Sequence, residues 1–261
     1  MRIETGPVVV IGGGVGPMAG VALHALIISN TLTDGTDQSH LTVHHYSCSA
    51  RIPDRTEYLL DHGKDDPALA MAQVFKLAAR ALDGRTAVGG VPCNTFHAPL
   101  IFDGFLAILA ESGVGIRIVN MLEETMLTLR QRLPGSASEK IGVLSTTGTR
   151  RSAVYDRLLE ASGFEPLYVP ESSQQLLHAS IYDRTWGLKA TPKPTDRAIE
   201  IVTTMASELV GRGAAALVLA CTELPLALGG SQFQTVPLVD PMVSLARALI
   251  REAAPDKLAP L

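Results

Sequence analysis

Residues 87–100, AVGGVPCNTFHAPL, and residues 214–228, AAALVLACTELPLAL, follow the same plan. Each begins as a short apolar run that leads to a cysteine, Cys93 in the first segment and Cys221 in the second. Continuous apolar runs of this length are typical of strands buried on both faces of a parallel sheet. The polar residues after each cysteine predict a helix start. We therefore expect two buried strands that each present a thiol at the carboxyl end.

A second pair of segments precedes these two strands and indicates an internal repeat. Residues 8–20, VVVIGGGVGPMAG, predict a strand, a glycine-rich turn and a helix, and residues 141–155, IGVLSTTGTRRSAVY, predict the same order. Repeated units of this kind usually stack or pair in space. In open parallel sheets, ligands bind at the carboxyl ends of the strands. Two such halves related by a pseudo-twofold would therefore share one cleft, with one cysteine on each side.

The whole chain predicts alternating strands and helices, which is typical of an α/β fold with parallel sheets. Further strands are expected at 41–47, 116–119, 163–169 and 236–239, and helices at 66–82, 98–112, 122–132, 172–186 and 195–212. We expect two similar α/β domains with the active site in the cleft between them. The first comprises residues 1–117 plus 236–261 and contains Cys93, and the second comprises residues 118–235 and contains Cys221.

Composition excludes several classes of protein. In 261 residues, 46% hydrophobic and 18% charged residues describe a globular chain with ample core rather than a disordered one. A formal charge of -4 without a long basic block argues against a nucleic-acid partner. No apolar run reaches the ~18 residues of a membrane span. The amino terminus does not resemble a secretory signal, and three cysteines are too few for a disulfide framework, so we expect a cytoplasmic protein with reduced thiols.

Two cofactor hypotheses fit these residues poorly. Gly14, Gly16 and Ala19 match the relaxed GxGxxA form of a dinucleotide fingerprint, but Pro17 interrupts it and no acidic residue ends a clear second strand. The glycines could instead present backbone N–H groups to a carboxylate at a helix start. Zinc would need Cys48, Cys93 and Cys221 to assemble from distant strands without any CxxC spacing. We therefore expect neither a cofactor nor a metal.

Two thiols that face one anionic substrate favour a particular reaction. Removal of a proton from the carbon beside a carboxylate needs a base on one face, and inversion needs an acid on the opposite face. A helix start beside each cysteine would lower the thiol pKa and make the thiolate accessible near neutrality. Fixed donors must stabilise the carbanion, and Asn94, Thr95 and Thr222 are candidates. The pattern therefore predicts racemisation.

Five motifs, in this order, resemble those of the aspartate/glutamate racemase superfamily and its aspartate racemase branch. They are GGVGP at 13–17, IPDRT at 52–56, PCNTFH at 92–97, TTGT at 146–149 and CTELP at 221–225. Together they cover nearly the whole chain. The resemblance implies a cofactor-independent racemase of an acidic amino acid, aspartate or glutamate, with two α/β domains of pseudo-twofold symmetry and often a homodimer.

The resemblance also implies the site residues. Cys93 and Cys221 would transfer the protons, and Arg55 would approach the distal carboxylate of the substrate. The remaining substrate contacts would come from the same motifs: Gly16, Pro17, Asn94, Thr95, Thr147, Thr149, Thr222 and Glu223. Glu223, where glutamate racemases have histidine, favours the aspartate branch.

Departures from the family pattern concern the substrate side chain. Val15 and Gly20 stand where methionine and threonine are frequent. A lysine that often follows an Ile-Tyr pair has no clear counterpart after Ile181-Tyr182: Trp186 stands near its place, and Lys189 is a candidate auxiliary residue.

Roles for three histidines and two alternative functions are also considered. His97 could orient Asn94 or polarise the Cys93 thiol, whereas His44 and His45 are expected to be structural. A related isomerase, decarboxylase or lyase of a small dicarboxylate could use one thiol, and a binding protein for an acidic amino acid would need none. The second cysteine favours the racemase over both.

Overall fold

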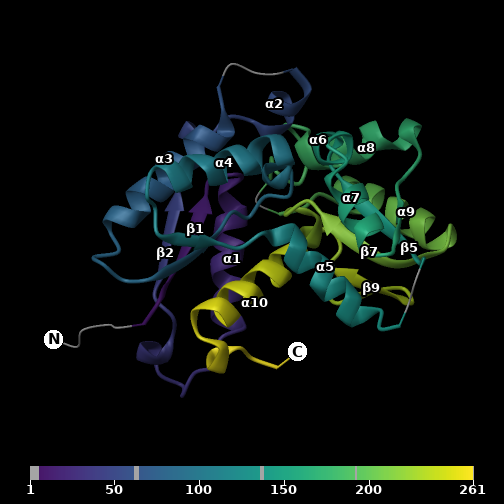
Figure 1. Ribbon diagram of the computed structural model, residues 1–261. Coiled ribbons are helices and arrows are strands. Elements are labelled where there is room, and N and C mark those ends of the chain that lie inside the picture. Colours follow the sequence, from purple (N-terminus) through teal and green to yellow (C-terminus); the bar gives the residue numbers. More distant parts are fainter. Residues whose placement is uncertain (1–5, 62–64, 136–137, 192, 261) are drawn as a thin grey trace. The chain divides into compact units, whose positions relative to one another are not determined.

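The computed structural model describes residues 6–61, 65–135, 138–191 and 193–260, and the chain divides into two compact units. Unit 1 comprises residues 1–121 and 242–261, and unit 2 comprises residues 122–241. Each unit is a mixed α/β structure built on a sheet with parallel strands (Figure 1). This confirms the predicted fold class, while the pseudo-twofold and the cleft stay predictions.

Unit 1 contains a four-stranded sheet in which all neighbours are parallel. Its spatial order is β2-β1-β3-β4, with β1 at Val8–Gly13, β2 at Val43–Ser47, β3 at Ala87–Gly90 and β4 at Ile116–Ile118. The helices are α1 (Pro17–Ser29), α2 (Arg55–Asp61), α3 (Pro67–Arg80), α4 (Pro99–Glu111) and α10 (Pro241–Ala253). Every residue of β1 is buried, which explains its uninterrupted apolar sequence.

The glycines of β1 and β3 show which helices cover each face of this sheet. A Cβ at Gly12 or Gly89 would meet the Phe75 ring of α3, whereas a Cβ at Gly90 would meet Leu245 of α10. Successive strand residues point to opposite faces, so α3 and α10 lie on opposite sides of the sheet. Phe75 also packs edge-on against Phe105 of α4, with 5.3 Å between the ring centroids. The sheet is therefore the middle layer of three.

Unit 2 contains a five-stranded sheet in the order β6-β5-β7-β9-β8. The strands are β5 (Lys140–Ser145), β6 (Glu165–Leu167), β7 (Ala214–Ala220), β8 (Gln232–Phe233) and β9 (Val236–Val239), and only the β8–β9 pairing is antiparallel. The helices are α5 (Met121–Arg132), α6 (Thr147–Arg151), α7 (Val154–Ala161), α8 (Glu171–Tyr182) and α9 (Asp196–Gly211). Thr195 caps α9 by accepting a hydrogen bond from the Ala198 N–H, as the sequence predicts.

Apart from the edge strand β8, the two sheets share a strand order that supports the internal repeat. In both units the first strand lies between the second and third strands of that unit, and the third strand is flanked on its other side by a later parallel strand, β4 in unit 1 and β9 in unit 2. Cys93 follows β3, the third strand of unit 1, and Cys221 follows β7, the third strand of unit 2. The two cysteines therefore occupy equivalent topological positions in their own units.

Some element boundaries differ from the expected ones. The sequence boundary assigns residues 236–239 to the first domain, but β9 pairs in parallel with β7 of unit 2, and the chain returns to unit 1 at Met242. Helix α8 ends at Tyr182 rather than at residue 186. Residues 55–61 form α2, for which no helix was predicted, and the Asp54 carboxylate accepts hydrogen bonds from the Thr56 and Glu57 N–H groups.

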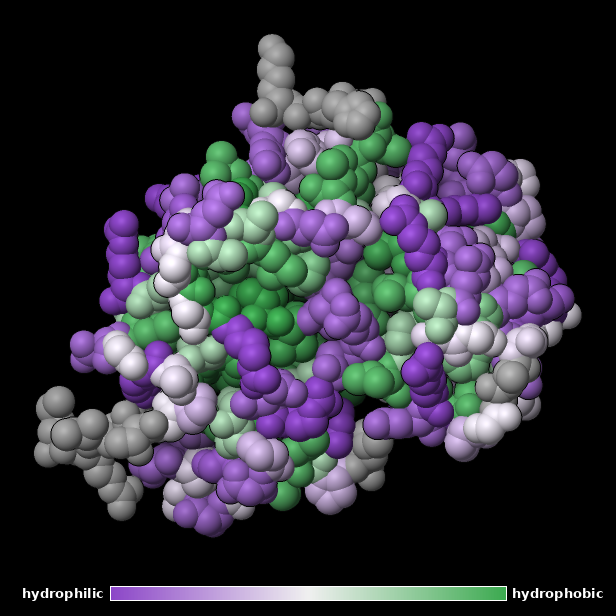
Figure 2. Space-filling model, viewed as in Figure 1, coloured by the Kyte–Doolittle hydropathy of each residue, from purple (hydrophilic) through white to green (hydrophobic). Residues whose placement is uncertain are grey.

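On the face of unit 1 that Figure 2 shows, hydrophobic residues gather in one region. Among the residues described, no helix combines the length and the apolar character that a bilayer crossing requires.

Gly89→Ala is expected to destabilise unit 1 by about 1–3 kcal/mol because the new methyl group overpacks the core. Its Cβ would lie 2.6 Å from Phe75 Cε1 and 3.0 Å from Ile116 Cγ2. Gly104→Ala in α4 is the matched control: its Cβ would meet only Ala68, at 3.7 Å, so helix propensity should make it stabilising by about 1 kcal/mol. Urea unfolding of both variants measures the difference, and equal stabilities would contradict this packing.

Candidate active site

The Cys93 segment forms a buried cluster in unit 1 at the carboxyl end of β3. Cys93, Asn94, Thr95 and His97 are all buried, with Cys93 6% exposed. Residues 95–97 form one turn of 3₁₀ helix, and α4 begins only at Pro99. The 3₁₀ turn therefore separates Cys93 from the expected helix, and the thiol does not lie at the first turn of α4. The segment packs against α2, the helix that begins at Arg55.

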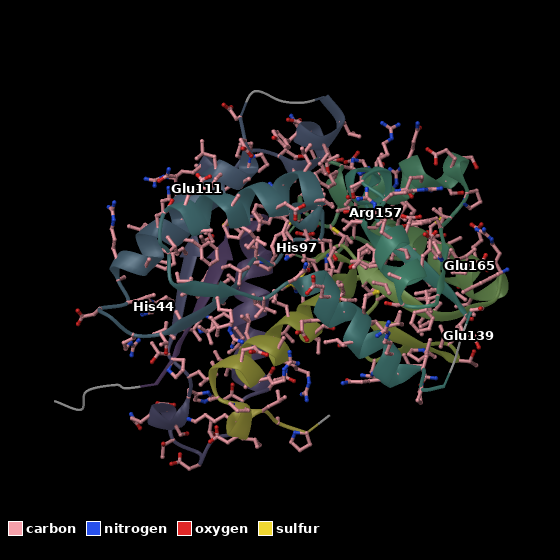
Figure 3. All side chains as sticks on the ribbon, in the orientation of Figure 1. His44, His97, Glu111, Glu139, Arg157 and Glu165 are labelled. Carbon is pink, nitrogen blue, oxygen red and sulfur yellow. The ribbon has the colours of Figure 1, made fainter. Side chains whose placement is uncertain are left out.

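His97 binds the backbone with both ring nitrogens. Its Nδ1 lies 2.8 Å from the carbonyl oxygen of Cys93, and its Nε2 accepts a hydrogen bond from the Met121 N–H at 3.3 Å. Nδ1 must therefore carry the proton and donate it. The ring also stacks on Phe102, with 4.5 Å between centroids. Figure 3 shows His97 in the interior of unit 1 and His44 on the edge strand β2. These contacts make His97 a support of the Cys93 backbone, not a partner of its thiol.

A pH dependence of stability is expected from His97. Burial lowers the pKa of His97 to about 4, against 6.5 for an unperturbed histidine. Between these values the unfolded chain binds more protons than the folded one, so stability is complete above about pH 6.5 and falls towards pH 4. The His97→Gln variant should be less stable than the parent at neutral pH. Its free energy of unfolding should also fall by on the order of 1–3 kcal/mol less than that of the parent between pH 6.5 and pH 4. Urea unfolding at several pH values tests this, and parallel stability curves would contradict it.

Arg55 is held against the glycine-rich turn that precedes α1. Its guanidinium donates to the carbonyl oxygens of Pro53 at 3.0 Å and of Val15 at 3.3 Å. The side chain is buried. Gly16 and Pro17 follow Val15, and Pro17 is the first residue of α1, where backbone N–H groups favour an anion. Unit 1 thus brings together Arg55, the turn at Gly16 and the Cys93 segment from three separate motifs.

The second cluster lies in unit 2, where Cys221 forms a hydrogen-bonded chain with Glu223 and Lys189. The Cys221 Sγ–H donates to Glu223 Oε2 at 3.1 Å, and the Thr222 hydroxyl donates to the same oxygen at 3.1 Å. Lys189 Nζ donates to Glu223 Oε1 at 2.9 Å and forms an ion pair with it. Cys221 is 6% and Glu223 5% exposed. At the end of β7, one carboxylate therefore binds a thiol through one oxygen and an ammonium group through the other.

The thiol pKa of Cys221 is raised, and not lowered as expected from the sequence. Burial, together with the neighbouring Glu223 carboxylate, raises the pKa of the Cys221 thiol well above its ordinary value. Burial alone would raise the pKa of Glu223, but the Lys189 ammonium and the hydrogen bonds keep this pKa lowered. Only a 3₁₀ turn at Leu224–Leu226 follows, so no long helix offers its dipole to the thiol. Cys221 is therefore a protonated thiol near neutral pH.

Lys189, and not Trp186, lies beside Cys221. A turn after α8 places it there: the Asp183 carboxylate accepts hydrogen bonds from Thr185 and Trp186, and the Lys189 N–H donates to the Ile181 carbonyl at 3.1 Å. Gly187 permits this turn, since a Cβ there would lie 2.7 Å from the Asp183 backbone. The Trp186 ring is covered by the Arg197 guanidinium, 4.1 Å from its centroid. The sequence did not predict the Lys189–Glu223 pair because this turn determines it.

The TTGT turn joins the unit 2 cluster through α8. The Thr146 hydroxyl caps α6 by accepting from the Thr149 N–H, and the Thr147 N–H donates to His178 Nδ1 at 3.3 Å. His178 stacks on Tyr182, and Lys189 Nζ lies 5.2 Å above that Tyr182 ring. His178 was not predicted as a site residue, because its spacing from Tyr182 is simply that of one helical turn. Thr147 and Thr149 are thus fixed near the helix that supports Lys189.

The structure also bears on the remaining candidates. Across the described ranges 6–61, 65–135, 138–191 and 193–260, no group of three histidine, cysteine or acidic side chains could hold a metal ion. All three cysteines are free, and Cys48 is half-buried at the margin of the unit 1 core. His45 is half-buried, and its Nε2 would be 2.3 Å from a Cβ at Gly20. Gly20, where threonine is frequent in the family pattern, therefore leaves space for His45.

Two α/β units whose parallel strands follow equivalent orders, each with a buried cysteine after its third strand, agree with the class of two-domain racemase folds. The chain belongs to the Asp/Glu/Hydantoin racemase family, whose model matches residues 13–249. It is accordingly an isomerase of the PLP-independent racemase type.

Solved structures agree with this assignment. The aspartate racemase of Picrophilus torridus is 27% identical, with a TM-score of 0.78 over 98% of this chain and 96% of that one. An aspartate racemase homologue from Pyrococcus horikoshii is 21% identical, with a TM-score of 0.66 over 95% and 99% of the respective chains. Glutamate racemase from Francisella tularensis, solved with D-glutamate, is 15% identical, with a TM-score of 0.60 over 99% and 84%. The last two share the fold.

Proposed function

We propose that this enzyme interconverts the L and D forms of an acidic amino acid, aspartate or glutamate, without a cofactor. Cys93 and Cys221 exchange protons with Cα from opposite faces. The observation that carries the proposal is that two buried free thiols occupy equivalent positions after the third strand of two similar sheets. The aspartate racemase of Picrophilus torridus, similar over almost the whole chain, favours aspartate.

Each cluster supplies what one half of the reaction needs. In unit 2, Cys221 is protonated and serves as the acid that delivers a proton to Cα. In unit 1, Cys93 serves as the base when the Cα proton leaves on its side, and the reverse direction exchanges these roles. Asn94, Thr95, Thr149 and Thr222 offer donors for the α-carboxylate as negative charge develops on it. Thr147 and the turn at Gly16 and Pro17 are further contacts.

Arg55 is proposed to bind the distal carboxylate of the substrate. It lies at the glycine-rich turn with its guanidinium fixed by the Pro53 and Val15 carbonyls. A fixed guanidinium binds a carboxylate with little further loss of side-chain freedom. This contact would separate acidic amino acids from neutral ones.

Incubation with L- and D-aspartate, L- and D-glutamate and a panel of neutral amino acids in D2O, without added cofactor, tests the proposal. Deuterium is expected at Cα together with inversion in one or both acidic amino acids, read by NMR and chiral chromatography. If every amino acid kept its Cα proton and its configuration, the proposal would be wrong.

A homodimer and a cytoplasmic location remain part of the proposal. The homodimer rests on the family resemblance, whereas the cytoplasmic location rests on the three free cysteines, which are compatible with a reducing compartment. Sedimentation equilibrium of the purified protein measures the oligomeric state, and a single species of monomer mass would contradict the homodimer.

A further inference from the structure

We propose that Glu223, held by Lys189, is a positioning residue that keeps Cys221 in its thiol form between turnovers and fixes the direction of its S–H bond. The inference rests on the proposed function, in which Cys221 transfers a proton. It gives Glu223 a different role from the substrate contact that the resemblance implies, and it assigns a role to Lys189, the candidate auxiliary residue.

The contacts of the Glu223 carboxylate support this role. Oε1 accepts from Lys189 at 2.9 Å, and Oε2 accepts from the Cys221 thiol and the Thr222 hydroxyl, each at 3.1 Å. These three donors fill most of the roughly four acceptor sites of a carboxylate. The side chain is 7% exposed, so little of it faces a ligand. Glu223 is therefore occupied by protein groups, and the thiol is one of them.

The charged groups around Cys221 explain why its proton is retained. Lys189, from the turn after α8, favours the thiolate, but its charge is directed to Glu223, which lies next to the thiol and opposes ionisation. Tyr155, from α7, is fully buried, and burial raises its pKa well above the ordinary value, so it is neutral and adds no charge near Cys221. Tyr182 of α8 lies beneath the Lys189 ammonium. Glu223 and Lys189 thus determine the charge around the thiol.

The two thiols are therefore not equivalent. Among the described residues, the Cys93 Sγ has no hydrogen-bond partner, whereas Cys221 is committed to Glu223. One direction of turnover uses Cys221 as the acid in its resting form, and the other first requires its ionisation. Although the two units are similar, the two cysteines therefore differ in hydrogen bonding.

Titration of Cys221 as the single thiol tests the inference without substrate. In a Cys48→Ser/Cys93→Ser parent labelled with carbon-13 at cysteine Cβ, the Cβ chemical shift reports ionisation of the Cys221 thiol. The parent thiol should stay protonated beyond the ordinary pKa of about 8.5. Glu223→Gln removes the carboxylate and exposes the thiol to the Lys189 charge, so its pKa should fall by about one to three units. Adding Lys189→Met to Glu223→Gln should reverse that fall.

Ionisation of the parent thiol at or below pH about 8.5, or an unchanged or raised pKa in Glu223→Gln, would overturn the inference. A fall that Lys189→Met does not reverse would overturn the role of Lys189. In the enzyme with all three cysteines, Glu223→Gln should also move the pH profile of kcat to lower pH in one direction of racemisation more than in the other. Because the titration needs no turnover, it remains decisive even if no amino acid is racemised.

Discussion

Cys93→Ala and Cys221→Ala are each expected to lower the racemisation rate by about 10²–10⁴-fold, the usual contribution of a positioned acid or base. Both cysteines are buried at the carboxyl end of a third strand. In the proposed two-thiol mechanism, loss of either leaves one face of Cα without a proton donor or acceptor. Initial rates from both enantiomers, measured by circular dichroism, give the size of the effect.

Cys48→Ala is the matched control, because Cys48 is a free, half-buried cysteine outside both clusters. It should keep the parent rate. The exchange of Cα hydrogen in D2O then separates the two roles: any residual exchange should be confined to one enantiomer in Cys93→Ala and to the other enantiomer in Cys221→Ala. Full activity of either alanine variant would refute the two-thiol mechanism.

Arg55→Gln is expected to reduce kcat/KM for the acidic substrate by about 10- to 100-fold, the effect of losing a hydrogen bond to a charged group. Neutral amino acids, if they react at all, should be affected much less. Kinetics with an acidic amino acid and its amide measure this difference in specificity.

Arg51→Gln provides the comparison for Arg55→Gln. Arg51 lies four residues earlier, is exposed, and carries the same charge, so its loss controls for net charge. Because Arg55 also bonds the Val15 carbonyl, thermal unfolding of both variants must be measured alongside. An equal loss for acidic and neutral amino acids would mean that Arg55 acts through the glycine-rich turn and not on the distal carboxylate.

The sequence was most informative where local rules determine structure. The apolar runs before Cys93 and Cys221 became β3 and β7, and the predicted helices at 66–82, 98–112 and 195–212 agree with α3, α4 and α9 to within two residues at each end. Capping explains this accuracy: Pro67 begins α3, and Asp66 and Thr195 accept the expected hydrogen bonds. Strand burial and helix capping depend on neighbours in sequence, so they can be predicted.

Features that depend on distant contacts could not be predicted in the same way. Strand β9 was recognised, but its sheet was not, because Leu238 and Val239 pair with β7 residues that lie 21 positions earlier in the chain, Leu217 and Val218. Lys189 was uncertain because α8 ends at Tyr182 and the Asp183 turn brings the lysine back to Glu223. The acidity of Cys221 was predicted with the wrong sign because burial and a carboxylate outweigh the weak field of a single 3₁₀ turn.

The discontinuity of unit 1 has a consequence for the order in which the chain can fold. Unit 2 is contiguous, but unit 1 is incomplete until residues 242–261 have been synthesised. Leu245 of α10 packs against Gly90 at the end of β3, Arg247 bonds Asn30 after α1, and residue 258 bridges to residue 31. On the ribosome, therefore, the sheet that carries Cys93 waits for the carboxyl-terminal helix, and the thiol nearer the amino terminus is the last to reach its final surroundings.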